Sequence, residues 1–153
     1  MSAIFGWNLV ALFSASEPSD QVSPGTSARV ADIMRGLRVL IVEDSYLTAR
    51  RLARMIEDLG GEVVGPAPSV QAAQHLLDTE GCDAAVLDIN LGNETVEPIA
   101  ARLQESHRPF LFVSGYSSPG FMNERVRSQR LLTKPVEPPA LADAIRELIG
   151  PAR

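Results

Sequence analysis

Short apolar runs alternate with amphipathic segments from Leu37 onward. The runs are nearly unbroken, as expected for strands that are buried on both faces of a parallel sheet. Between them, apolar residues recur every three or four positions, which is the spacing of one face of a helix. The pattern predicts five strands, at residues 38–42, 62–65, 83–87, 109–113 and 130–133. Strands that alternate with helical segments in this way favour an α/β fold with a doubly wound, five-stranded parallel sheet.

Capping and helix-breaking residues mark where the helical segments begin. A serine hydroxyl can accept a hydrogen bond from the backbone of a helix's first turn, so Ser45 and Ser69 are expected to cap the first two helices. A third helix is predicted over about 95–105, and it tolerates Pro98 only within its first turn. The last helix is predicted to open at Pro138.

The N-terminal residues 1–36 do not follow this pattern. Residues 4–13 are mostly apolar, and residues 14–27 are rich in serine, proline and other small or polar types. The apolar stretch is too short to span a bilayer and lacks the basic start of a secretory signal. Three interpretations stay open: a disordered, non-essential extension, translation that begins at Met34, or a short interfacial or partner-binding segment. We therefore place the folded domain at 37–150 and expect no stable membrane insertion.

Composition narrows the class of protein. The chain has 153 residues, of which 45% are hydrophobic and 22% charged, which is ordinary for one soluble globular domain. The net charge of −5 and the lack of a long basic run argue against nucleic-acid binding. The single cysteine, Cys82, excludes an internal disulfide and fits a cytoplasmic location. Lys134 is the only lysine among 14 basic residues, and it lies beside a proline after an apolar run.

Polar residues follow four of the predicted strands where each strand ends. Glu43 and Asp44 follow the first strand, Asp88 the third, Ser114 the fourth and Lys134 the fifth. Any one of them alone would more often be a cap or a solvated residue. In doubly wound sheets, however, ligands bind outside the carboxyl ends of the strands. The four strand ends are therefore expected to form one site.

The residue types at these strand ends suit phosphoryl transfer to a carboxylate. Clustered carboxylates repel one another, and Mg²⁺, which prefers carboxylate, water and phosphate oxygens, relieves that repulsion. A metal ion bound by Asp44 and Asp88 leaves Asp88 free to attack a phosphoryl group, and aspartyl phosphates are an established covalent form. The transferring group spreads negative charge over three oxygens. Lys134 can supply the positive charge, and Ser114 can supply a hydroxyl.

Four motifs resemble the receiver domain of two-component response regulators, over residues 37–150 and in the same order. They are VLIVEDS (39–45), AVLDINLG (85–92), VSGY (113–116) and TKP (133–135). The resemblance implies a flavodoxin-like receiver fold and a histidine kinase or a phosphotransfer protein as the phosphodonor.

The same resemblance assigns roles to individual residues. It implies that Asp88 accepts the phosphoryl group and that Ser114 and Lys134 sense it. It implies a Mg²⁺ site made by the carboxylates of Glu43, Asp44 and Asp88 and by the main-chain carbonyl of Asn90. It also implies a cis peptide bond before Pro135, which is uncommon for X–Pro bonds in general.

One position departs from the common receiver pattern. Leu131 stands where most receivers carry the aromatic switch residue of the last strand. The run PFLFVSGY (109–116) instead resembles the subgroup nicknamed FATGUY, which makes Tyr116 the candidate switch residue and points to HWE/HisKA2-type histidine kinases. Residues 117–128 are polar and are expected to form only a short, irregular helix, which places the usual switching surface in doubt.

Only 17 residues follow Val136, enough for one helix, so we expect a stand-alone response regulator. Its output would be phosphorylation-dependent partner binding, or drainage of phosphoryl groups from a shared kinase. The alternative is a receiver-like module that binds proteins without phosphorylation, although such a module has no reason to keep the whole acid, hydroxyl and lysine set. Two further alternatives, a phosphohydrolase and a flavodoxin-type binding protein, fit less well. Haloacid-dehalogenase-type phosphatases carry an Asp-x-Asp pair after the first strand, and flavodoxins carry a phosphate loop there.

Overall fold

A five-stranded parallel sheet forms the centre of the computed structural model, which describes residues 32–115 and 128–150. The strands lie in the order β2-β1-β3-β6-β7, and each neighbouring pair is parallel. Their bounds are Arg38–Val42 (β1), Glu62–Ala67 (β2), Ala84–Asp88 (β3), Phe110–Ser114 (β6) and Leu131–Thr133 (β7). The predicted α/β fold with a five-stranded parallel sheet is confirmed, and each strand lies within two residues of its predicted position.

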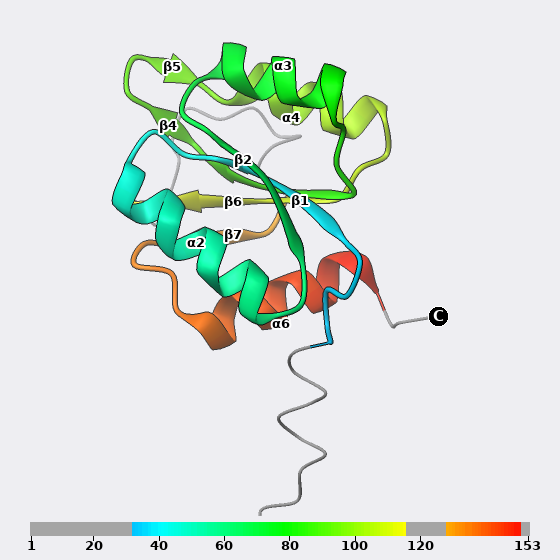
Figure 1. Ribbon diagram of the computed structural model, residues 1–153. Coiled ribbons are helices and arrows are strands. Elements are labelled where there is room, and N and C mark those ends of the chain that lie inside the picture. The colour runs from blue at the N-terminus through cyan, green and yellow to red at the C-terminus, as the bar shows by residue number, and fades with distance from the viewer. Residues whose placement is uncertain (1–31, 116–127, 151–153) are drawn as a thin grey trace, which may run out of the picture.

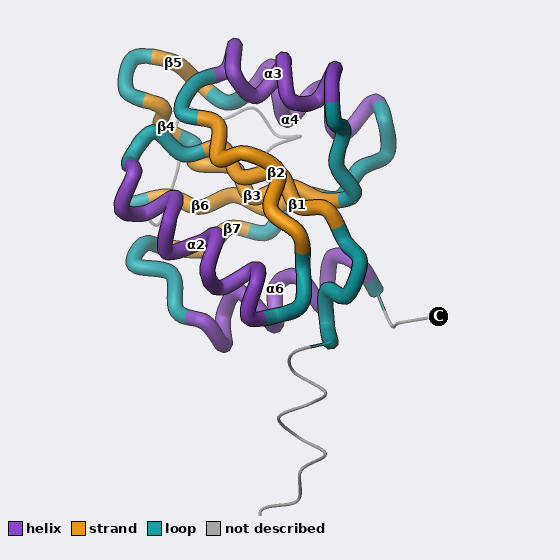
Figure 2. Tube along the Cα trace, viewed as in Figure 1, coloured by secondary structure: helices purple, strands orange, loops and turns teal. Residues whose placement is uncertain are grey.

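Helices cover both faces of the sheet, so that the strands form a middle layer between two helical layers (Figures 1 and 2). Helices α2 and α6 pack on one face, and α3 and α4 pack on the other. Their bounds are Tyr46–Asp58 (α2), Val70–Thr79 (α3), Glu97–Glu105 (α4) and Pro138–Ile149 (α6). None of the described helices is long and apolar enough to cross a bilayer.

The helices begin where the sequence predicts. The Ser45 hydroxyl accepts a hydrogen bond from the backbone N–H of Thr48, and the Ser69 hydroxyl accepts one from Ala72. Pro98 lies in the first turn of α4, where its missing N–H has no intrahelical partner to lose. The irregular helix predicted over 117–128 falls outside the described residues, apart from Ser128.

A two-stranded hairpin follows the central strand and was not predicted from the sequence. Asn90–Leu91 (β4) pairs antiparallel with Glu94–Thr95 (β5). Gly92 lies in its turn with φ 61°, a conformation that favours glycine over other residues. The Glu94 carboxylate accepts a hydrogen bond from the backbone N–H of Val70 at 3.2 Å, so the hairpin also contacts the first turn of α3.

The packed part of the chain begins before residue 37. Met34, which we placed in the N-terminal extension, is fully buried among the side chains between the sheet and the α2 and α6 layer. Its backbone N–H donates to the carbonyl of Leu59 at 2.9 Å. An unbranched apolar side chain fills this space well, so Met34 belongs to the domain rather than to the extension.

We predict that Met34→Ala lowers the free energy of unfolding by about 2–5 kcal/mol, because truncating a fully buried methionine removes apolar contacts and leaves a cavity. Arg35→Ala is the matched control, since the Arg35 side chain is 79% exposed and its change should stay within about 0.5 kcal/mol. Urea unfolding of both variants measures the difference. Equal stabilities would show that residue 34 contributes nothing to the core.

Candidate functional site

The residues predicted at the strand ends lie together at one edge of the sheet. Asp88 is the last residue of β3, and Ser114 is the last residue of β6. Glu43 directly follows β1, and Lys134 directly follows β7. The strand registers pair Asp88 with Val113 and Ser114 with Thr133, which brings the carboxyl ends of β3, β6 and β7 to the same level. The expectation that the strand ends meet is therefore fulfilled for these residues.

Three carboxylates form the acidic part of this site. Glu43 and Asp88 are buried, whereas Asp44 is exposed. Each offers an oxygen, and these oxygens all lie within 4.8 Å of one another. Carboxylate oxygens at such spacing repel when ionised and can together hold a hard divalent cation. The chemistry of this oxygen set fits Mg²⁺, in agreement with the sequence-based expectation.

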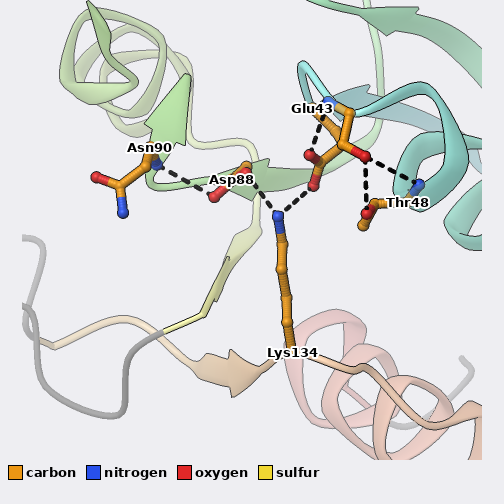
Figure 3. A network of polar contacts seen from close by, with 6 residues as sticks. Glu43, Thr48, Asp88, Asn90 and Lys134 are labelled. Atoms are coloured by element: carbon orange, nitrogen blue, oxygen red, sulfur yellow. Dashed lines mark hydrogen bonds and ion pairs between the residues drawn. The ribbon is translucent and has the colours of Figure 1, made fainter. Parts of the chain in front are cut away.

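Lys134 places its ammonium group between the two buried acids (Figure 3). Its Nζ lies 2.6 Å from Asp88 Oδ2, to which it donates a hydrogen bond, and 2.6 Å from Glu43 Oε2. The peptide bond between Lys134 and Pro135 is cis, as the resemblance implies. The single lysine of the chain thus neutralises part of the charge that gathers at the sheet edge.

The electrostatic balance of this cluster is visible in two pKa values. Burial of the Glu43 carboxyl raises its pKa above the ordinary value of 4.5, and the negative charge of Asp88 adds to the increase, although Lys134 and the backbone N–H of Ser45 oppose it. Burial of the Lys134 ammonium tends to lower its pKa, but hydrogen bonds and charge from Asp88 and Glu43 outweigh this and raise the pKa above 10.5. Lys134 is therefore fully charged at neutral pH.

The hairpin fixes the other side of the acid cluster. The backbone N–H of Asn90 donates to Asp88 Oδ1 at 3.1 Å, so the two oxygens of Asp88 have different partners (Figure 3). A side-chain carbon at Gly92 would lie 3.7 Å from Asp44 Oδ2, which means that the hairpin turn borders the exposed acid. We did not predict this contact. The signal was present, since the two-residue turn Gly92–Asn93 is typical of a hairpin.

Ser114 is buried at 1% exposure at the end of β6. Its carbonyl accepts a hydrogen bond from the backbone N–H of Lys134 at 2.8 Å, which joins the last two strand ends. Gly115, the next residue, is exposed. Tyr116, the candidate switch residue, lies outside the described residues.

These features agree with what comparisons with known proteins find. Residues 39–146 match the response regulator receiver domain, and the chain belongs to this family. It is 32% identical over 121 residues to the positive alginate biosynthesis regulatory protein of Pseudomonas aeruginosa, covering 76% of this chain and 49% of that protein. It is 28% identical over 116 residues to the transcriptional regulatory protein PdtaR of Mycobacterium tuberculosis, covering 75% and 56%. The chain thus spans about half the length of these curated relatives.

Solved structures support the same assignment. The solution structure of SdrG from Sphingomonas melonis Fr1 is 32% identical, with a TM-score of 0.66, and the match covers 78% of this chain and 99% of that one. The response regulator PhyR from Brucella abortus is 26% identical, with a TM-score of 0.68, and the match covers 81% and 51%. The chain is therefore a two-component receiver domain, and its fold matches nearly the whole of one solved chain and about half of the other.

We predict that Lys134→Ala lowers the free energy of unfolding in metal-free buffer by about 1–3 kcal/mol, because it leaves two buried carboxylates without their cation. Added Mg²⁺ should restore part of this loss by neutralising the same acids. Because the pKa of Lys134 is raised on folding, its contribution is complete at neutral pH and disappears only as pH rises beyond 10.5. Urea titrations with chelator and with Mg²⁺ provide the measurement.

The matched control is Arg146→Ala, which breaks an exposed pair with Asp143 on α6 and should cost no more than about 0.5 kcal/mol. A Lys134→Ala loss no larger than that of the control would contradict the structural role of the buried lysine contacts.

Proposed function

We propose that the chain accepts a phosphoryl group on Asp88 from a histidine kinase. The observation that carries this proposal is the arrangement of three acid oxygens within 4.8 Å beside an ammonium group that contacts two of the acids at 2.6 Å. A protein that only used the fold as a binding surface would gain nothing from gathering buried like charges there, because burial of charged groups is costly.

Magnesium fits the proposed reaction because the site already holds its preferred ligands. Glu43, Asp44 and Asp88 would hold the ion with the main-chain carbonyl of Asn90, and the bound ion would reduce the charge that repels an incoming phosphoryl group. Residues of the chain itself orient the acceptor carboxylate. Asn90 N–H and Lys134 hold the two oxygens of Asp88 from different directions, which orients the carboxylate before attack.

The transfer forms one bond and breaks another. A carboxylate oxygen of Asp88 bonds to phosphorus while the bond from phosphorus to the donor's imidazole nitrogen breaks, and the imidazole keeps the electron pair. Lys134 loses one of its two carboxylate partners as Asp88 becomes an acyl phosphate, so its ammonium can contact a phosphoryl oxygen instead. Ser114, at the end of the adjacent strand, supplies a second group for that purpose. These changes provide the signal that the rest of the domain reads.

We further propose that the domain acts alone, in the cytoplasm, by phosphorylation-dependent partner binding or as a phosphate sink. Support comes from the SdrG solution structure, of which the chain covers 99%. A receiver-like module that binds partners without phosphorylation is the alternative, and the labelling experiment below separates the two.

We predict that the full chain, incubated with acetyl phosphate and Mg²⁺, gains one phosphoryl group and that Asp88→Asn abolishes this gain. The amide of asparagine cannot form the acyl phosphate. Intact mass spectrometry counts the added groups, and chelation of Mg²⁺ should prevent the labelling of the wild type.

Asp83→Asn is the matched control, because Asp83 directly precedes the opposite end of the same strand, and this change should leave labelling unchanged. Labelling that survives Asp88→Asn would show that another residue accepts the phosphoryl group. A wild-type chain that folds, binds Mg²⁺ and still takes up no phosphoryl group would favour the phosphorylation-independent module.

The phosphodonor is proposed to be a kinase of the HWE/HisKA2 type, because PFLFVSGY (109–116) resembles the motif of receivers that such kinases serve. We predict faster transfer from purified, autophosphorylated HWE/HisKA2 kinases of the source organism than from its other histidine kinases. Loss of labelled kinase over time, followed on gels, measures the rate. Equal rates from both groups of kinases would refute this preference.

A further inference from the structure

An apolar groove runs along helix α2. A hollow of about 450 Å³ is lined by Leu47 and Met55 of α2 and by Pro135 and Val136, which follow β7. A second hollow, of about 380 Å³, is lined by Met55 again and by residues of α6. Because Met55 lines both, the two hollows adjoin, and together they define the α2–α6 groove. Figure 1 shows these two helices side by side on one face of the sheet.

The groove has a large apolar side chain at its rim. Among the described residues, the exposed large hydrophobic side chains are Tyr46 and Leu47, which are 71% and 78% exposed, and Leu47 also lines the first hollow. Charged residues also line the two hollows, and one of them, Arg51, pairs with Glu137 at 3.3 Å. Because leucine, methionine, proline, valine and alanine make up most of the rest of the lining, the groove suits a mainly apolar segment of polypeptide.

The two ends of the groove connect the site to the N-terminal side of the chain. Lys134 lines the first hollow, and Leu59 lines the second. The Leu59 carbonyl accepts the hydrogen bond from the backbone of Met34. The described chain therefore begins, at Asp32, close to the end of the groove that is farther from Lys134.

The residues before Asp32 include a segment of matching chemistry. Residues 4–13 read IFGWNLVALF, and no charged side chain occurs before Glu17. Residues 14–31 link this segment to the domain, and a linker of that length can reach at most about 59–65 Å. Helix α2 has 13 residues and is therefore about 20 Å long, so the linker can place the segment anywhere along the groove.

We propose that residues 4–13 bind in the α2–α6 groove of their own chain. The short linker holds the segment at an effective concentration of about millimolar, so a weak intrinsic affinity is enough for occupancy. The bound segment covers Leu47 and the flank of Lys134. It thereby competes with macromolecules that approach the phosphoacceptor over α2, while small phosphodonors still reach it. This inference does not depend on phosphorylation and can be tested apart from it.

Trp7 allows a direct test because it is the only tryptophan in the chain and lies within the segment. In the full-length protein, Trp7 should emit at shorter wavelength than in a synthetic peptide of residues 1–16, and acrylamide should quench it less. Leu47→Glu should shift the emission to longer wavelength and increase quenching. Gln104→Glu, an equal charge change on α4 across the sheet, is the matched control and should change neither.

A second variant protects the test against misfolding. Leu9→Asp changes the segment and leaves every residue of the folded domain as it is. It should shift the Trp7 emission to longer wavelength, as Leu47→Glu does. Emission of the wild type equal to that of the peptide would overturn the proposal, as would a Leu47→Glu spectrum that matches the control. Emission that depends on protein concentration would also overturn it, because the segment would then bind between copies.

Discussion

Charge repulsion among three carboxylates is the constraint on which the rest of the structure depends. Parallel strands bring Glu43, Asp44 and Asp88 to one edge, and two of these acids are buried there. Left alone, such a cluster would oppose folding, since buried charges need partners. Lys134 provides this partner, because its ammonium contacts both buried acids. Under the proposed function, the same arrangement would also suit the site to a cation and a phosphoryl group.

Much of the fold could be predicted from local signals in the sequence. Short apolar runs indicated the strands, and Ser45 and Ser69 indicated where two helices begin, because capping is decided by residues only three positions apart. The hairpin at residues 90–95 escaped prediction because its strands are two residues each, too short to show any alternation. Met34 was assigned to the extension because its burial depends on contact with distant residues such as Leu59.

The sequence predicts which residues form the candidate site better than it predicts the contacts between them. The topology of a doubly wound sheet brings strand ends together, so Asp88, Ser114 and Lys134 could be grouped from their positions alone. The sequence does not specify which acid the lysine contacts. The ion pair with Glu43 depends on the direction of two side chains from strands that are neither adjacent in sequence nor paired with each other. The packing of the Gly92 turn against Asp44 is likewise a product of tertiary structure.

The unequal exposure of the three acids determines the side from which a cation could reach them. Glu43 and Asp88 are enclosed, while Asp44 faces solvent. A cation held by all three acids would therefore meet solvent on the side of Asp44, while Glu43 and Asp88 would hold it from within the domain. The turn at Gly92 borders that same side, so a substitution there would change the entrance to the site and leave the buried acids in place.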